Sequence, residues 1–193
     1  ALKIDEKVYG PDHPNVAIDV NNLGGVLKDL GELQEARKLF ERSLRINEQV
    51  YGPDHPDMAK SINNLGGVLK DLGELQEARK CFERALKIDE KVYGPDHPNV
   101  AIRVNNLGSV LQDLGELQEA RKFYERALKI YEVVYGPDHP DVATMANNLG
   151  GVLKALGDLQ EARKCFERAL KIDEKVYGPD HPDVATMANN LGG

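Results

Sequence analysis

The sequence predicts an all-α protein, an α-solenoid of antiparallel helix hairpins in a right-handed superhelix. Two observations carry this prediction: a strict internal period of 42 residues, and apolar residues spaced three and four apart within each period. The hexapeptide Tyr-Gly-Pro-Asp-His-Pro marks each period, starting at Tyr9, Tyr51, Tyr93, Tyr135 and Tyr177. It contains all ten prolines and all five histidines. We therefore expect one array over residues 1–193, rather than several domains.

The first half of each period carries one amphipathic helix, which we call helix A. In the first complete copy it begins at Pro14, and its apolar stripe is Val16, Val20, Leu23, Leu27 and Leu30. Asp12 is positioned to cap this helix, and a proline in the first turn removes no intrahelical hydrogen bond. Gly31 is expected to end the helix.

The second half of each period carries helix B, which packs against helix A as an antiparallel hairpin. Its stripe in the first copy is Leu33, Ala36, Phe40, Ser43 or Leu44, and Val50. We expect it to run for about 17 residues until Gly52 and Pro53 stop it. Gly24 and Ala36 are small where the two helices approach closely, and Phe40 fills the gap beside them. One hairpin cannot bury its stripe alone, so neighbouring hairpins must stack.

This spacing places the complete hairpins at residues 14–51, 56–93, 98–135 and 140–177. Residues 1–9 correspond to the end of a helix B, and residues 182–193 to the first half of a helix A. Neither end has a polar cap, so burial of two apolar stripes against another molecule should be favourable. They are Leu2, Ile4 and Val8 at one end and Val184, Ala188 and Leu191 at the other. We expect head-to-tail self-association through these ends, with fraying of both half-helices as the alternative.

Composition and charge argue against several classes of partner. The chain is 30% charged and 41% hydrophobic, and it has no apolar run near the roughly 20 residues that a membrane span needs. Its net charge is −7 with acids and bases interleaved, whereas nucleic-acid binding needs Lys and Arg gathered on one face. The chain opens in mid-repeat at Ala1 without a secretory signal, so it looks excised. We expect a cytoplasmic protein with no nucleic-acid or membrane partner.

Several positions of each repeat match a known pattern. In the first copy they are Leu23, Gly24, Leu27, Gly31, Ala36, Phe40 and Ser43. They resemble the signature of the tetratricopeptide repeat, and the resemblance covers the whole chain. Two positions depart from it: the large aromatic usual early in helix A is Val20, and the proline that usually ends helix B is Glu48. Without that proline helix B continues, which lengthens the usual unit of about 34 residues. The longer repeat resembles those of kinesin light chains, nephrocystin-like proteins and sensor arrays of microbial signalling ATPases.

The resemblance implies a protein–protein interaction scaffold that binds extended peptide segments in a concave groove lined by helix A. Carried over residue by residue, the groove positions are Asn21, Asn22, Gly25, Lys28 and Asp29; Asn63, Asn64, Gly67, Lys70 and Asp71; Asn105, Asn106, Ser109, Gln112 and Asp113; and Asn147, Asn148, Gly151 and Lys154. A side-chain amide offers both a donor and an acceptor, which suits a peptide backbone. Clamping of a C-terminal carboxylate is not expected, because Lys60 alone matches the family's basic positions.

Three alternatives stay open at this point. For each asparagine pair two roles are equally supported: contact with a ligand in the groove, or a structural amide that bonds to the adjacent helix. Variation at Asp19, Ser61, Arg103 and Met145 is expected to reflect drift on an accessible helix end, rather than side-chain preference for a ligand. Finally, the chain could be a purely structural or self-assembling array, excised or engineered, without a specific ligand.

Catalysis and cofactor binding find no support in the sequence. The histidines occur singly, one per repeat, and His13 is expected to be a link or cap residue rather than a base. Asp54 and His55 are too few ligands for a metal site. Cys81 and Cys165 are two repeats apart, too far for a disulfide, and are expected to be small buried apolar residues. We therefore predict that the protein is not an enzyme and holds no cofactor or metal.

Overall fold

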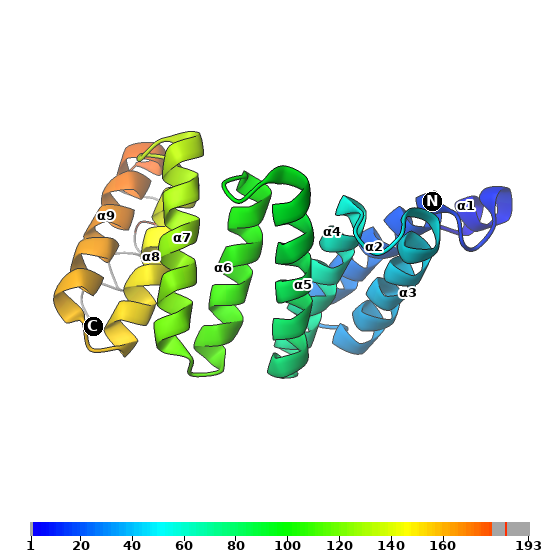
Figure 1. The fold of residues 1–193 in the computed structure, drawn as a ribbon, viewed down its shortest axis with the longest axis horizontal. Helices are drawn as coiled ribbons and strands as arrows, with labels where there is room; N and C mark the ends of the chain where they lie inside the picture. Colours follow the sequence, from blue (N-terminus) through cyan, green and yellow to red (C-terminus); the bar gives the residue numbers. More distant parts are fainter. Residues whose placement is uncertain (1, 179–183, 185–193) are drawn as a thin grey trace. The chain divides into compact units, whose positions relative to one another are not determined.

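The computed structural model describes residues 2–178 and Val184, and the regular structure in that part of the chain is entirely helical (Figure 1). The helices are α1 (Leu2–Tyr9), α2 (Pro14–Asp29), α3 (Leu33–Tyr51), α4 (Pro56–Asp71), α5 (Leu75–Tyr93), α6 (Pro98–Asp113), α7 (Leu117–Tyr135), α8 (Pro140–Ala155) and α9 (Leu159–Tyr177). The predicted all-α class and the alternation of helices A and B are confirmed. The predicted helix A over residues 182–193 lies, apart from Val184, outside the described residues.

The chain forms two compact units, Ala1–Gly94 and Pro95–Gly193. In the first unit α2 pairs with α3 and α4 pairs with α5, and α3 of one hairpin packs on α4 of the next. The second unit repeats this order with the α6–α7 and α8–α9 hairpins, joined through α7 and α8. Within each unit, then, hairpins stack consecutively as a repeat solenoid does.

Each described helix A is capped by the histidine of the hexapeptide. His13 has an extended backbone, and its Nδ1 accepts a hydrogen bond from the Asn15 amide at 3.2 Å. The predicted cap Asp12 is wrong, because Pro14 occupies the first helical position and places His13 directly before it. The Tyr9 ring stacks on His13 with centroids 4.7 Å apart, which fixes the imidazole in its capping position. The prediction that His13 is a cap residue is confirmed.

Glycines with positive φ separate the helices. Helix α2 ends at Asp29, and Gly31 follows at φ +79°, while α3 ends at Tyr51 before Gly52 at φ +82°. This left-handed backbone suits glycine, which has no Cβ to clash. Helix B is 19 residues long, rather than about 17, against 16 residues for helix A. Its last turn therefore extends past the helix on which it packs, and Val50, predicted in the buried stripe, is 46% exposed.

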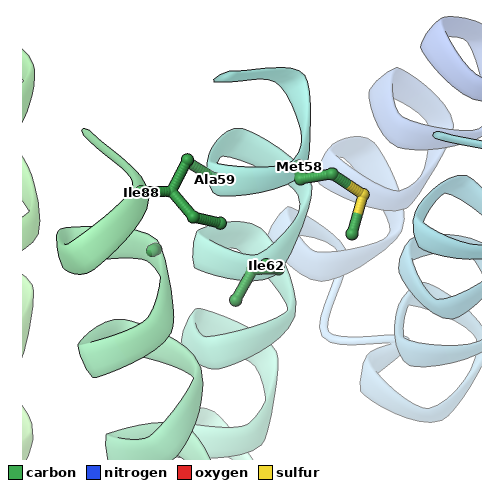
Figure 2. Close-up of a cluster of buried hydrophobic side chains, with 5 residues drawn as sticks. Met58, Ala59, Ile62 and Ile88 are labelled. Carbon is green, nitrogen blue, oxygen red and sulfur yellow. The ribbon is translucent and has the colours of Figure 1, made fainter. Parts of the chain in front are cut away.

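Small clusters of apolar side chains fill the spaces between helices. Figure 2 shows one of them, in which Ile88 of α5 points toward Ala59 and Ile62 of α4. Met58 and Ala85 complete it, and the partly buried Leu44 of α3 packs against the same cluster. The core is thus distributed along the stack, with each cluster drawing on helices of adjacent hairpins.

Helices A and B approach most closely where a glycine faces an aromatic ring. The glycine–ring pairs are Gly24 with Phe40, Gly66 with Phe82, Gly108 with Tyr124, and Gly150 with Phe166. A Cβ added to these glycines would lie between 2.7 and 3.0 Å from the nearest ring carbon, closer than carbon atoms pack. The small-residue packing predicted for Gly24 and Phe40 is therefore confirmed, and it recurs in every complete hairpin.

The adjacent glycines Gly66 and Gly67 give a matched test of this contact. We predict that Gly66→Ala lowers stability, because its Cβ would lie 2.8 Å from the Phe82 ring and 3.1 Å from Cys81 Cβ; overpacking a core costs about 1–3 kcal/mol. Gly67→Ala should raise stability by up to about 1 kcal/mol through helix propensity, since its nearest atom is Lys28 Cε at 3.5 Å. Thermal unfolding followed by circular dichroism compares the two. Equal midpoints for both variants would contradict the packing account.

Candidate functional site

Five of the predicted groove residues line one pocket of the second unit. The pocket has a volume of about 290 Å³ and is lined by Gln112 of α6, by Asn147, Asn148, Gly151 and Lys154 of α8, and by Phe166 of α9. The Tyr124 hydroxyl hydrogen-bonds Gln112 Oε1 at 3.3 Å, and burial raises the pKa of Tyr124 to about 12, so it stays a neutral donor. Two successive helices A thus contribute polar side chains to one hollow.

The charge balance of this surface differs between the two units. In the first unit Lys28 Nζ lies 3.1 Å from Asp71 Oδ2 of the next helix A, so Asp71 partly neutralises the charge of Lys28. In the second unit the matching positions hold Gln112 and Ala155, which form no ion pair. Lys154 is exposed and has no acidic partner among the described residues. The second unit therefore offers a cation beside the pocket.

The asparagine pairs connect successive helices A. Asn64 Nδ2 donates to Asn21 Oδ1 at 3.2 Å, and Asn148 Nδ2 donates to Asn105 Oδ1 at 3.0 Å. Both bonds join the first asparagine of one repeat to the second asparagine of the next. Each amide still has groups to spare, because an NH₂ carries two hydrogens and the carbonyl oxygen has two lone pairs. These residues thus bond to the adjacent helix. Asn148, which lines the pocket, keeps one N–H and its carbonyl oxygen beyond that bond.

The other predicted residues are spread along the helix A surfaces of each unit. Asn22 is exposed, whereas Asn63, Lys70 and Asn106 are half-buried. Lys60 is exposed and lines a second, smaller pocket in the first unit, together with Asn21. That pocket, of about 50 Å³, lies between α2, α3 and α4.

Variation at the beginning of helix A does not lie on an accessible end, and that prediction is wrong. Ser61 is 3% exposed, Arg103 9% and Met145 4%. The reason is the extra length of helix B: its last turns reach the beginning of the next helix A, as shown by Asn47 Nδ2 of α3 donating to Ser61 Oγ at 3.2 Å. Asp19, at the same position in α2, is half-buried with its Oδ2 atom enclosed and without a hydrogen-bond partner.

Sequence reasoning named Ser43 as one option for the buried stripe of helix B, but it missed Asn47, which reaches the same interface. Ser43 is fully buried and Asn47 is 6% exposed. The sequence did contain a signal, because position 47 changes along with position 61: Asn47 and Ser61 become Tyr131 and Met145 two repeats later. A small polar pair is replaced by a larger and mainly apolar pair, a joint change that fits two side chains in contact.

The outer surface of helix B carries paired charges. Arg37 Nε lies 2.9 Å from Glu41 Oε1, and Lys38 Nζ lies 2.6 Å from Glu35 Oε1. Arg37 also reaches Glu74 at the beginning of the next helix B, at 2.9 Å. These exposed pairs contribute at most about 1 kcal/mol each, and they describe a solvated face rather than an acid–base site.

Groups capable of catalysis or metal binding are sparse in the described part of the chain. Cys81 and Cys165 are half-buried rather than buried, and burial raises the pKa of both thiols, which disfavours the nucleophilic thiolate. Over residues 2–178 and Val184, no three His, Cys, Asp or Glu side chains gather in a way that would hold a metal ion. Within the same residues no helix has the length and apolar character that crossing a membrane requires.

Comparison with known proteins identifies the class. One family model described as tetratricopeptide repeat matches residues 20–57 and 58–99. A second model of the same description matches residues 101–154 and 141–193. The chain therefore belongs to the tetratricopeptide repeat family, whose members generally act as non-enzymatic scaffolds for protein–protein interaction. No curated protein matches the chain.

Solved structures place the chain more closely within that family. BtubC (BKLC) from P. vanneervenii is 22% identical with a TM-score of 0.83, over 98% of this chain and 75% of that one. A kinesin light chain of Podosopora anserina with nearly identical TPR-like repeats is 25% identical with a TM-score of 0.81, over 93% of this chain and 85% of that one. A point variant of that protein is 24% identical with a TM-score of 0.82, over 93% of this chain and 84% of that one. This chain is an array of the kinesin-light-chain-like type.

Proposed function

We propose that the chain is a non-catalytic scaffold that binds extended peptide segments on the polar surfaces of its helices A. The observation that carries this proposal is the pocket of about 290 Å³ in the second unit, where Gln112, Asn147, Asn148 and Lys154 lie together. This volume is near the lower limit of roughly 300 Å³ for small-molecule sites, and the lining is polar rather than apolar. It suits a short stretch of peptide better than a drug-like ligand.

The chemistry of the pocket indicates what kind of peptide it binds. The amide of Asn148 has an N–H and a carbonyl oxygen beyond its bond to Asn105, which match the acceptor and donor of a peptide backbone. A Cβ on Gly151 would meet no atom within 4 Å, so a ligand backbone has room to approach α8 at this point. Lys154 adds one cation without an acidic partner among the described residues. An extended segment with an acidic side chain is therefore the preferred ligand.

We predict that the purified chain retains a subset of acidic, unstructured peptides from a library, and that Gln112→Ala with Lys154→Ala weakens their binding at least tenfold. The physical reason is loss of two polar contacts, one of them charged, at about 1.5–3 kcal/mol for a hydrogen bond to a charged group. Fluorescence anisotropy with labelled peptides measures the dissociation constants.

The matched control is Gln118→Ala with Lys164→Ala, which makes the same chemical changes on the exposed surface of helices B. This control should bind as the unmodified chain does, and both variants should keep its helical circular dichroism. Equal weakening by the two pairs would indicate a non-specific charge effect. Absence of any bound peptide would contradict the proposed function.

A second proposal concerns self-association, and the exposed apolar side chains of α2 favour it. Val26 is 55% exposed and Leu30 67%, whereas Val68, Val110 and Val152 at the position of Val26 are completely buried. Val68 packs against Ala36 and Phe40 of the preceding helix B. We propose that a helix B of a second copy covers α2 in the same way. Leu159, which begins α9 and is 61% exposed, is the matching apolar residue.

The end stripes expected from the sequence fit this second proposal in part. Ile4 and Val8 are 65% and 63% exposed, whereas Leu2 packs against the cluster around Val16. Val184 is 4% exposed, and Ala188 and Leu191 lie outside the described residues.

We predict that the weight-average mass in sedimentation equilibrium rises with concentration, and that Val26→Glu with Leu30→Glu restores an ideal monomer, since burying two carboxylates in an apolar contact is unfavourable. Ile18→Glu with Ile102→Glu is the control, because these exposed positions are equivalent to Lys60. The control should associate as the unmodified chain does. Monomeric behaviour of the unmodified chain at high concentration would eliminate this second proposal.

A further inference from the structure

We propose that the pocket between α2, α3 and α4 is a subsite for a side-chain carboxamide, that of glutamine or asparagine, on a bound peptide. This inference rests on the proposed function, because it names one side-chain preference of the peptide surface in the first unit. The pocket is lined by Pro14, Ala17, Ile18, Asn21, Ser43, Asn47, Tyr51, Asp57, Lys60 and Ser61. Helices A of two successive repeats and the end of the intervening helix B all contribute.

Hydrogen bonds under the pocket run in one direction. The Ser43 hydroxyl donates to the Ala17 carbonyl at 3.0 Å, which uses the only hydrogen of that hydroxyl. The Ser61 hydroxyl, 3.1 Å from Ser43 Oγ, must therefore be the donor in that pair. Asn47 Nδ2 in turn donates to Ser61 Oγ at 3.2 Å. The chain of bonds fixes the amide of Asn47 with its nitrogen toward Ser61.

Two amides at the pocket have hydrogen-bonding groups left over. Asn47 is 6% exposed and Asn21 is 8% exposed, so both are more than nine-tenths buried. Among the described residues, the carbonyl oxygen and second N–H of Asn47 have no partner, and Asn21 uses only its Oδ1, for Asn64. Buried polar groups in proteins are almost always hydrogen-bonded. Both residues line the pocket, so their remaining groups are open to a ligand or to solvent there.

The size and charge of the pocket select the ligand. A site needs about 10–15 Å³ for each water-sized group, so a volume of about 50 Å³ accommodates roughly three to five of them. The end of a glutamine or asparagine side chain, CH₂–CO–NH₂, has four non-hydrogen atoms. Asp57 and Lys60 at the pocket oppose each other in charge, which favours neither a carboxylate nor an ammonium group. A carboxamide supplies the acceptor for an amide N–H and the donor for the Asn47 carbonyl oxygen.

The second unit shows how the same interface is built without these groups. Ala127, Tyr131 and Met145 hold the positions of Ser43, Asn47 and Ser61, and they are 0%, 7% and 4% exposed. Apolar side chains occupy the positions of the polar network. The chain therefore provides its own tolerated replacement: Asn47→Tyr introduces the residue that the equivalent helix already carries.

The test uses selective ¹⁵N-serine labelling, because the chain contains only Ser43, Ser61 and Ser109. Ser43 and Ser61 report on the pocket, and Ser109, a predicted groove position of the second unit, reports whether a probe binds there instead. The probes are the capped tripeptides acetyl-Gly-Gln-Gly-amide, acetyl-Gly-Glu-Gly-amide and acetyl-Gly-Met-Gly-amide, added to the full chain. We expect the glutamine probe to shift the Ser43 and Ser61 amide signals in a saturable manner, while Ser109 stays unchanged and the other two probes have at least fivefold weaker effects.

Two variants guard against a trivial loss of signal. Asn47→Tyr should abolish the glutamine response while circular dichroism shows normal helicity. Asn47→Asp keeps the side-chain volume and introduces the residue that two other repeats carry at the equivalent position, Asp89 and Asp173. It removes the N–H donors and should weaken the response at least fivefold. Three results would overturn the inference and leave a solvent-filled pocket: equal responses to all three probes, an equal shift of Ser109, or no response at about 20 mM glutamine probe. At that concentration even millimolar binding, about 4 kcal/mol, would saturate.

Failure of this inference and failure of the proposed function are distinguishable. If longer peptides bind through Gln112 and Lys154 while the Ser43 and Ser61 signals do not move, the subsite is wrong and the scaffold function stands. If the serine signals respond to the glutamine probe but no library peptide is retained, the subsite stands and the wider peptide surface is wrong.

Discussion

The close contact between a glycine of helix A and an aromatic ring of helix B is the constraint on which the rest of the structure depends. With a ring carbon 2.7–3.0 Å from the position of a missing Cβ, the two helices of a hairpin lie closer together than a residue with a Cβ would allow. The same contact recurs in all four complete hairpins, so the two helices of each hairpin pack at a similar distance. Since stability in such arrays comes from neighbour interfaces, uniform hairpins allow uniform stacking.

Stacking in turn positions the polar residues of helix A. The bonds from Asn64 to Asn21 and from Asn148 to Asn105 cross between successive helices, so their geometry is set by the hairpin spacing. An asparagine inside a helix is unfavourable on its own, because its amide competes with the backbone. Here one amide group is engaged across the interface and the remainder faces outward. The proposed peptide surface and the packing between repeats therefore use the same side chains.

Sequence periodicity predicted the helices well because each repeat contains its own start and stop signals. It assigned the helix A cap to Asp12 rather than His13, because the preference for aspartate at caps outweighed the effect of the following proline and the stacked tyrosine. The burial of Ser61 and Met145 could not be found from one helix alone, since it arises from the longer helix B of the preceding repeat. The joint change from Asn47 and Ser61 to Tyr131 and Met145 was the available signal. Continuity of the array over residues 1–193, its handedness and the cytoplasmic location stay predictions.

Hydrogen–deuterium exchange of the full chain, with and without a retained acidic peptide, tests the central claim most directly. If peptides bind on the helix A surfaces, exchange should slow in α6 and α8, which carry Gln112, Asn148 and Lys154, and stay unchanged at the solvent-facing beginning of α9. Protection confined to helices B, or no protection at saturating peptide, would contradict the account.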